Sequence, residues 1–516
     1  MDSKSIIITA FSIISIYITN ILLHKSIIEK TENSNVPSKI QESHDYFATS
    51  NQSFLKAEEN SRKQLKFCFY TKDNYTKRFE SIRHVIEKLG YQEVPLYAHD
   101  LHYNWDLVWS FPGLPVLKLN YSKLKDHQKI NHIPGISFLI QKSILATDTD
   151  SKYVPKGFED ELHMQRYAKE HPDAKFVRKN KANRGVSIVT VEKMNFTSSG
   201  NFYDDLFAQV FVEDPYLVNG HKFDLNIYVG ISSVDPLRIY YYAKTYHLRF
   251  CEKPYNPNNF DDLDTYVISD NYIPGLEFPA IRKYTDHGYL AKEALHLYFI
   301  EQGINPKIIV DQIEDAISSI VLQKAPEIVE KIVPQKAANG KYHFFELVRF
   351  DFILDAKLKL YLMEVNMSPN LQPHVKMRAH KPIYENLVYN FLNLVGIGTT
   401  VSDKNVGQFT EDESSFVLND HSISVTPDIC LNRPCNETCD STQCDLCLNC
   451  MSDSFKYDLK LAFWEHMNMG EFRRVVPPPN INLMETNSTY WKNLSPTNTL
   501  YAKWLIEMCK TNSRFC

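Results

Sequence analysis

The sequence lacks an excess of either charge. Its 57 Lys and Arg residues stand against 62 Asp and Glu residues, which leaves a formal net charge of −5. No bulk positive field therefore directs the chain to nucleic acid, and any basic patch must be local. The sequence also has no internal repeat. Because 43% of its 516 residues are hydrophobic and 13% are aromatic, the chain is not disordered and can bury a large core in two or three domains.

An uncharged apolar run lies at the N-terminus, from Ile6 to Leu23, and it is long enough to span a bilayer. No A-x-A-like cleavage site follows it, which favours an anchor over a cleaved signal peptide. A buried helix is the other alternative. We expect a transmembrane anchor over residues 1–24 and a flexible polar stalk over residues 25–63, and hence a single-pass membrane protein. The charges beside the run set its orientation poorly.

Cysteine is scarce in most of the chain, since only Cys68 and Cys251 of the ten cysteines lie outside residues 430–516. The even number in this last region favours disulfides. Zinc is the alternative, because a C-x2-C-x2-C spacing begins at Cys444. Clustered cysteines and several formal N-glycosylation sequons favour a glycoprotein whose body is exoplasmic or lumenal, with a cytosolic body as the alternative.

The first region expected to be ordered has the pattern of a strand, a helix and a strand. Residues 65–71 alternate with a period of two, the apolar positions of residues 79–89 recur at helical spacing, and residues 105–110 resemble another strand. This order predicts an α/β (α+β) fold. Later tracts rich in Val, Ile, Phe and Tyr predict antiparallel strands, and residues 311–324 predict a helix. The acidic, Ser-rich residues 401–429 predict a linker to the cysteine-rich region.

Two apolar tracts, FELVRFDFILD and LYLMEVN, predict a hairpin that carries unexpected oxygen donors. Glu364 and Asn366 share one face of their strand because side chains alternate with a period of two. If Asp351 lies opposite them, three hard oxygen donors converge, a set that suits Mg²⁺ completed by water and nucleotide phosphates. The alternative is a solvent-facing strand edge with ordinary charges. Asn366 also begins a formal sequon, and a sugar there would occupy the metal site.

Five tracts of the sequence resemble the tubulin tyrosine ligase-like family, whose fold is the ATP-grasp fold. They are NWDLVWS with KINHIPGISFLIQKS, then SKYVPKGF, KFVRKNKANRGVSIV, AQVFVEDPYLVNGHKFDLNIYVGISSVDPLRIYYY and the hairpin. The tracts follow the family's order across roughly residues 66–395. We therefore expect a ligase domain over residues 64–400, with an N-terminal α/β part followed by central and C-terminal ATP-grasp subdomains, and a cysteine-rich region over residues 430–516.

The resemblance implies a tubulin polyglutamylase, which uses ATP and Mg²⁺ to add glutamate to the acidic tail of tubulin or another protein through an acyl phosphate. With the anchor expected from the N-terminal run, we expect this ligase to be membrane-anchored. An ATP-binding pseudoenzyme and a lumenal ligase for a non-tubulin acceptor are the alternatives. The implied nucleotide-binding residues are Lys179, Arg184, Gly185, Gln209, Val210, Phe211, Val212, Lys222 and Asp224. The implied catalytic residues are Lys222, Asp224 and Asn226, and the implied metal ligands are Asp351, Glu364 and Asn366.

The part of the site that would receive the incoming amino acid departs from the family pattern. The family block usually reads lysine-phenylalanine-aspartate-leucine-arginine, whereas this sequence reads KFDLN, with Asn226 in the arginine position. An amide replaces neither the charge nor the fork of donors of arginine. Ser187 occupies the second glycine position of the phosphate loop. The resemblance therefore does not fix which amino acid is added.

Overall fold

The structure is a computed structural model that describes residues 64–516 apart from 73–74, 96–103, 114–118, 120, 181–185, 195, 197–205, 269–270, 333–339, 373–379, 399–416, 433–434 and 480–493. Residues Gln64–Cys516 form one compact unit. The predicted anchor and stalk, residues 1–63, lie outside the described residues, as does most of the predicted acidic linker.

The predicted single-pass membrane localisation is corrected by the helices of the described residues. In this part of the chain, no helix is both long enough and apolar enough to cross a bilayer. The longest, α10 (Lys307–Ile332), carries acidic and basic residues along its length and packs one apolar side against the core. The run from Ile6 to Leu23 that led to the prediction lies outside the described residues.

A small parallel sheet begins the ordered chain. Its strand order is β2-β1-β3-β4, formed by β1 (Lys66–Tyr70), β2 (Gln92–Glu93), β3 (Leu107–Ser110) and β4 (Lys129–Ile130). Helix α3 (Glu80–Lys88) follows β1, as the helical spacing of its apolar residues predicts, and packs against α11 (His380–Leu394). The predicted strand-helix-strand order and the α/β class are confirmed.

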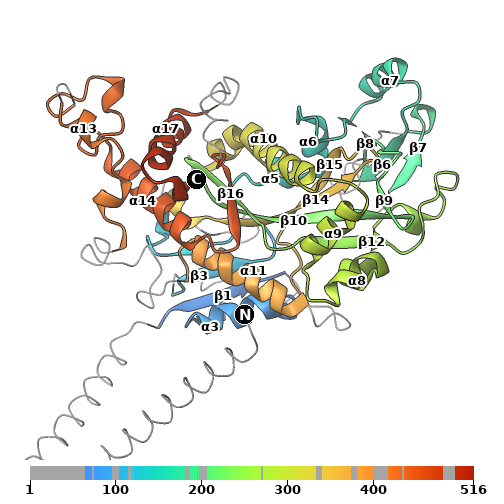
Figure 1. Cartoon of the computed structure of the whole chain (residues 1–516), viewed down its shortest axis with the longest axis horizontal. Coiled ribbons are helices and arrows are strands. Elements are labelled where there is room, and N and C mark those ends of the chain that lie inside the picture. Colours follow the sequence, from blue (N-terminus) through green and yellow to red (C-terminus); the bar gives the residue numbers. More distant parts are fainter. Residues whose placement is uncertain are drawn as a thin grey trace, which may run out of the picture. The chain divides into compact units, whose positions relative to one another are not determined.

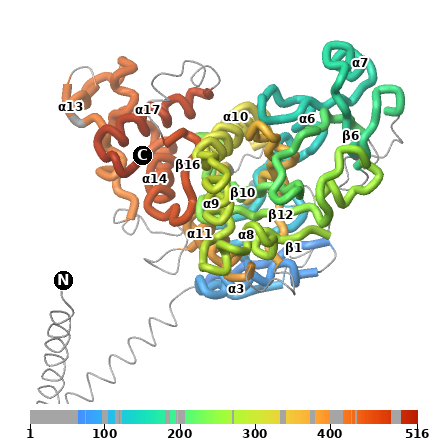
Figure 2. The backbone as a smooth tube through the Cα atoms, turned by 45° about the vertical axis from the view of Figure 1, so that its right-hand side comes forward, coloured from blue at the N-terminus to red at the C-terminus, as the bar shows by residue number. Residues whose placement is uncertain are grey.

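The central sheet is built around one long strand, β10 (His221–Val234), which pairs with β9, β11, β12 and β14. Side chains of β10 alternate between two buried faces. Ile227 and Val229 pack in the core that contains α10, whereas Tyr228 packs in the core that contains α11. Figures 1 and 2 show α10 and α11 on opposite sides of β10. Burial on both faces explains why the stretch of β10 from Ile227 to Ile231 carries no charged residue.

The predicted hairpin is formed by β14 (Glu346–Leu354) and β15 (Leu360–Met367), which pair antiparallel beside β10. The other strands of the central sheet are β9 (Leu217–Val218), β11 (Leu237–Tyr242), β12 (His247–Cys251), β13 (Tyr272–Pro274) and β16 (Phe472–Val476). The remaining α-helices are α5 (Ser137–Ile140), α6 (Lys142–Thr147), α7 (Glu161–Glu170), α8 (Pro279–Thr285), α9 (Ala291–Glu301), α13 (Pro427–Cys430), α14 (Asp453–Asn468) and α17 (Pro496–Thr511).

A third sheet, of order β5-β8-β6-β7, is antiparallel and is covered by α7. It consists of β5 (Gly157–Phe158), β6 (Phe176–Asn180), β7 (Ser187–Val189) and β8 (Leu206–Val210). This small sheet and α7 lie together at one end of the molecule in Figure 1. The cavity described below is lined by residues of this sheet and of the central sheet.

Two buried polar side chains join the N-terminal sheet to β14. His132 Nδ1 lies 2.9 Å from Glu346 Oε1, and the Ile133 backbone N–H donates to Glu346 Oε2 at 3.0 Å. The neighbouring Asn131 side chain bonds both backbone groups of Ser110 at the end of β3. The Asn-His-x-Pro-Gly tract therefore fixes β14, the strand that carries Asp351, against the first sheet.

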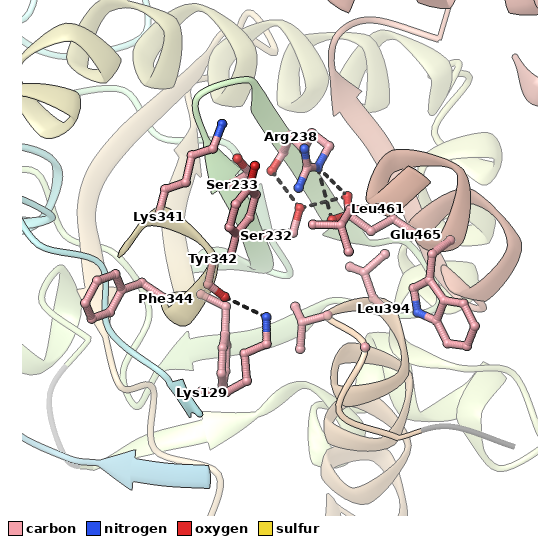
Figure 3. Close-up of a pocket in the computed structure, with 14 residues that line it drawn as sticks. Lys129, Ser232, Ser233, Arg238, Lys341, Tyr342, Phe344, Leu394, Leu461 and Glu465 are labelled. Carbon is pink, nitrogen blue, oxygen red and sulfur yellow. Dashed lines mark hydrogen bonds and ion pairs between the residues drawn. The ribbon is translucent and has the colours of Figure 1, made fainter. Parts of the chain in front are cut away.

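The cysteine-rich region is held by disulfides and also completes the central sheet. The pairs are Cys430–Cys447, Cys435–Cys444, Cys439–Cys450 and Cys509–Cys516, which confirms the disulfide prediction over zinc. Strand β16 pairs with β11 at the edge of the central sheet. Beside it, Arg238 on β11 and Glu465 on α14 form a buried ion pair, drawn in Figure 3. The region is therefore part of the same compact unit as the sheet it extends.

Candidate active site

The hairpin brings the three predicted metal ligands together. Asp351 and Glu364 are directly opposite each other in the β14–β15 register. Asn366 Nδ2 lies 3.0 Å from both Asp351 Oδ2 and Glu364 Oε1. An amide side chain also carries an oxygen that can serve as a ligand. Two carboxylates and one amide within hydrogen-bond reach form the hard-oxygen donor set that Mg²⁺ prefers.

Basic side chains neutralise these carboxylates in the described structure. Arg349 forms a two-pronged pair with Asp351, with its Nε 2.6 Å from Oδ1 and its Nη2 2.7 Å from Oδ2. Arg249 Nη2 lies 3.1 Å from Asp351 Oδ2, and Lys142 forms an ion pair with Glu364. Burial raises the pKa of Asp351 to about 6, although both arginines oppose the shift. Burial also acts to raise the pKa of Glu364, but Lys142, Asn366 and Arg349 together outweigh it and the pKa falls.

The three predicted catalytic residues share one face of β10. The buried Lys222 donates to the Tyr266 backbone carbonyl at 2.8 Å, and burial lowers its pKa. Asp224 accepts a fork of hydrogen bonds from Arg249 Nε and Nη2. Asn226, which is fully buried, donates both amide hydrogens, to Asp224 Oδ1 at 2.7 Å and to the His247 carbonyl at 2.8 Å. The amide of Asn226 is therefore occupied by contacts within the protein.

A cavity of about 300 Å³ lies between the small antiparallel sheet and the central sheet. Its cationic and acidic lining residues are Lys142, Lys179, Lys222, Arg249, Asp224, Asp351 and Glu364, and its other lining residues are Val177, Val186, Phe211, Tyr266, Val267, Ile268, Ile353 and Met363. Lys179 Nζ donates to Gln209 Oε1 at 2.6 Å, and Gln209 is anchored on the Pro155 carbonyl. Burial, with help from Lys142, lowers the pKa of Lys179 to about 7.

The predicted site residues fall into four groups. Lys179, Phe211, Lys222, Asp224, Asp351 and Glu364 line the cavity, and Gln209, Asn226 and Asn366 support lining residues through hydrogen bonds. Val210 and Val212 line an adjacent open hollow of about 630 Å³, together with Phe211. Arg184 and Gly185 lie outside the described residues.

Sequence reasoning missed three basic residues at this site: Lys142, Arg249 and Arg349. Arg349 had a visible signal, since it stands two residues before Asp351 in the same strand and therefore shares its face. Arg249 and Lys142 had none, because the strand and helix that carry them reach the acidic cluster only through the tertiary fold.

The lining residues fit a nucleotide and a divalent cation. Apolar side chains, among them Phe211, Ile353 and Met363, offer a surface for an aromatic base. The half-buried Lys179 and the buried Lys222 carry positive charge for phosphates. The acidic hairpin offers hard oxygen donors at the same cavity.

Comparison with known proteins agrees with this arrangement. A family model described as "Tubulin-tyrosine ligase family" matches residues 120–405. A Caenorhabditis elegans protein named "Probable tubulin polyglutamylase ttll-15" is 29% identical over 453 residues, covering 86% of this chain and 84% of its own length. Mouse "Tubulin polyglutamylase TTLL6" is 27% identical and mouse "Tubulin monoglutamylase TTLL4" is 28% identical. The alignments cover 83% and 54% of this chain but only 51% and 24% of those relatives. The chain belongs to the tubulin-tyrosine ligase family.

Proposed function

We propose that this chain is an ATP-dependent ligase that joins glutamate to the acidic tail of a protein, with tubulin as the acceptor. The observation that carries the proposal is the meeting of Asp351 and Glu364 with Lys179, Lys222 and Arg249 around one cavity. The relatives named as tubulin polyglutamylases and monoglutamylases support the choice of amino acid and acceptor.

In the proposed reaction, a carboxylate of the acceptor attacks the terminal phosphoryl group of ATP, which gives an acyl phosphate and ADP. The amine of glutamate then displaces phosphate and forms the amide bond. Such chemistry depends mainly on holding the reactants and stabilising charge on the transferring phosphoryl group. The protein groups described above are arranged for that task rather than for covalent catalysis.

Each polar side chain has a distinct task in this proposal. Lys179 and Lys222 neutralise nucleotide phosphates as compact charges, and Gln209 holds Lys179 in place. Arg249, whose fork is bound by Asp224, adds a fixed positive charge to the wall of the same cavity. Asp351, Glu364 and Asn366 would hold Mg²⁺, which when bound supplies further positive charge at the transferring group. The aromatic ring of Phe211 and its apolar neighbours would hold the base and exclude water.

The proposal is tested by glutamate incorporation. The purified chain is incubated with ATP, Mg²⁺, labelled glutamate and tubulin, and compared with Asp351→Asn and Glu364→Gln. We expect each substitution to reduce incorporation by about 10²-fold or more, since each removes charge at the phosphoryl-transfer site. The exposed Asp311, which pairs with Lys307 on α10, supplies the control Asp311→Asn, which should keep full activity. Activity that survives both hairpin substitutions would contradict the assignment.

An ATP-binding pseudoenzyme is the second candidate, and Asn226 favours it. Its amide is committed to Asp224 and His247, so β10 supplies no cationic group at this position. The same experiment separates the two proposals. Tight nucleotide binding without incorporation of glutamate into any acceptor favours the pseudoenzyme. Incorporation of glutamate that depends on Asp351 favours the ligase.

A further inference from the structure

Arg349 approaches the acidic hairpin from outside the nucleotide cavity. Its side chain is only 12% exposed and does not line the cavity, yet both of its prongs bond the carboxylate of Asp351, which does line it. In the β14–β15 register, Arg349 is directly opposite Asn366. Arg349 therefore holds a predicted metal ligand, Asp351, from outside the cavity, and Asn226 of β10 lies opposite the same Asp351 in the neighbouring register.

Metal binding and the Arg349 contact compete for the same oxygens. Both carboxylate oxygens of Asp351 accept from Arg349, at 2.6 and 2.7 Å. Oδ2 also accepts from Arg249 and Asn366, so a divalent cation that takes this oxygen as a ligand must displace one of its three donors. The charge of the cation also repels the buried guanidinium. Arginine cannot give up its charge to relieve the loss. A buried guanidinium that loses its carboxylate is strongly unfavourable unless another anion replaces it.

The described side chains around Arg349 do not supply that replacement. The carboxylates that act most strongly on Arg349 are Asp351 and Glu364, and both belong to the predicted metal site. Asp224 is already engaged by the fork of Arg249. Asn226, opposite Asp351 on β10, is neutral and has no free amide hydrogen. An anion brought by a ligand is therefore the natural new partner of Arg349.

We propose that Arg349 binds a carboxylate of the incoming amino acid. Arg349 becomes available for this contact only when nucleotide is bound and the accompanying metal ion takes Asp351 as a ligand. Amino-acid binding then follows nucleotide binding, and β14 supplies the positive charge that β10 lacks at Asn226. The inference rests on the proposed ligase function for the identity of the ligand. It goes beyond that function by assigning a binding residue and an order of binding.

The test measures equilibrium binding of glutamate to the full chain by calorimetry, without and with Mg²⁺ and a non-hydrolysable ATP analogue. We expect the analogue and metal to tighten glutamate binding at least about tenfold, the size expected for a charged, two-pronged contact. The Arg349→Gln variant should still bind the analogue but lose this gain in glutamate affinity. The Arg349→Lys variant should keep part of the gain. The exposed Arg282 on α8 supplies the control Arg282→Gln, which should behave as the unaltered chain does.

A second variant tests the exchange of partners directly. Asp351→Asn removes the charge that holds Arg349 in the empty site, so glutamate should bind without nucleotide. Equal glutamate affinity in the empty and loaded protein, no glutamate binding in either state, or an undiminished gain in Arg349→Gln would each overturn the inference. Failure of the ligase proposal looks different, because it shows as absent incorporation while nucleotide-dependent glutamate binding remains.

Discussion

The buried pair of Arg238 and Glu465 should be one of the strongest links between the cysteine-rich region and the central sheet. Arg238 Nε lies 3.1 and 2.9 Å from the two carboxylate oxygens of Glu465, and Ser232 Oγ and Tyr240 OH each donate to the same carboxylate at 2.9 Å. The Arg238 and Glu465 side chains are only 2% and 6% exposed. Figure 3 shows Ser232, Arg238 and Glu465 together, with their contacts as dashed lines.

Glu465→Ala removes the carboxylate and leaves the Arg238 charge buried without its main partner. Loss of one member of a buried pair lowers the free energy of unfolding by about 3–5 kcal/mol. The matched control is Glu471→Ala, which breaks the partly exposed pair between Glu471 and Lys244. That change should lower the free energy of unfolding by about 1 kcal/mol or less. Urea unfolding followed by tryptophan fluorescence measures both, and Trp464 on α14 reports directly on this region.

Two results would refute this reasoning. The first is an equal loss of stability in Glu465→Ala and Glu471→Ala. The second concerns the double variant Arg238→Met with Glu465→Leu, which removes both charges. It should be more stable than Glu465→Ala, because no unpaired charge remains buried. A double variant that loses the sum of the single effects would show that the pair matters through packing alone.

Three further predictions follow from individual contacts. The pKa of Lys179 is lowered to about 7, so its ammonium is present below pH 7 and lost above it. Nucleotide affinity should therefore fall as pH rises through 7. Fluorescence titration of nucleotide binding should show this pH dependence in the unaltered chain and not in Lys179→Met. Reduction of Cys430–Cys447 and its neighbouring disulfides should lower the unfolding midpoint of the cysteine-rich region, since each bond contributes about 2–4 kcal/mol; unchanged calorimetric melting in reductant would contradict this. Gly230→Ala should destabilise by about 1–3 kcal/mol, because its Cβ would lie 2.7 Å from the Phe391 ring; equal unfolding midpoints for the variant and the unaltered chain would contradict the close packing.

The local sequence pattern was sufficient to predict the acidic hairpin. A period of two placed Glu364 and Asn366 on one face, and a short turn was enough to bring Asp351 opposite them. The same rule places Arg349 beside Asp351, but a charged side chain next to a carboxylate does not by itself indicate a bond. The family resemblance then added the predicted nucleotide-binding residues of β6, β8 and β10.

Long-range contacts account for what sequence reasoning could not find. Arg249 and Lys142 reach Asp351 and Glu364 from elements far away in the sequence, and no local spacing encodes that approach. The edge strand β16 follows the cysteine cluster in the sequence but pairs with β11, more than two hundred residues earlier. The membrane localisation was wrong. It rested on the apolar run and on the lack of a cleavage site after it, and no helix of the described residues is long and apolar enough to cross a bilayer.

Mass spectrometry of tubulin tails tests the central claim most directly. Tubulin is incubated with the purified chain, ATP, Mg²⁺ and glutamate, in parallel with the Asp351→Asn variant. The account predicts tails that gain whole glutamate residues, only in the presence of ATP and only with the unaltered chain. Unmodified tails from a chain that binds nucleotide, or the same additions by Asp351→Asn, would contradict it.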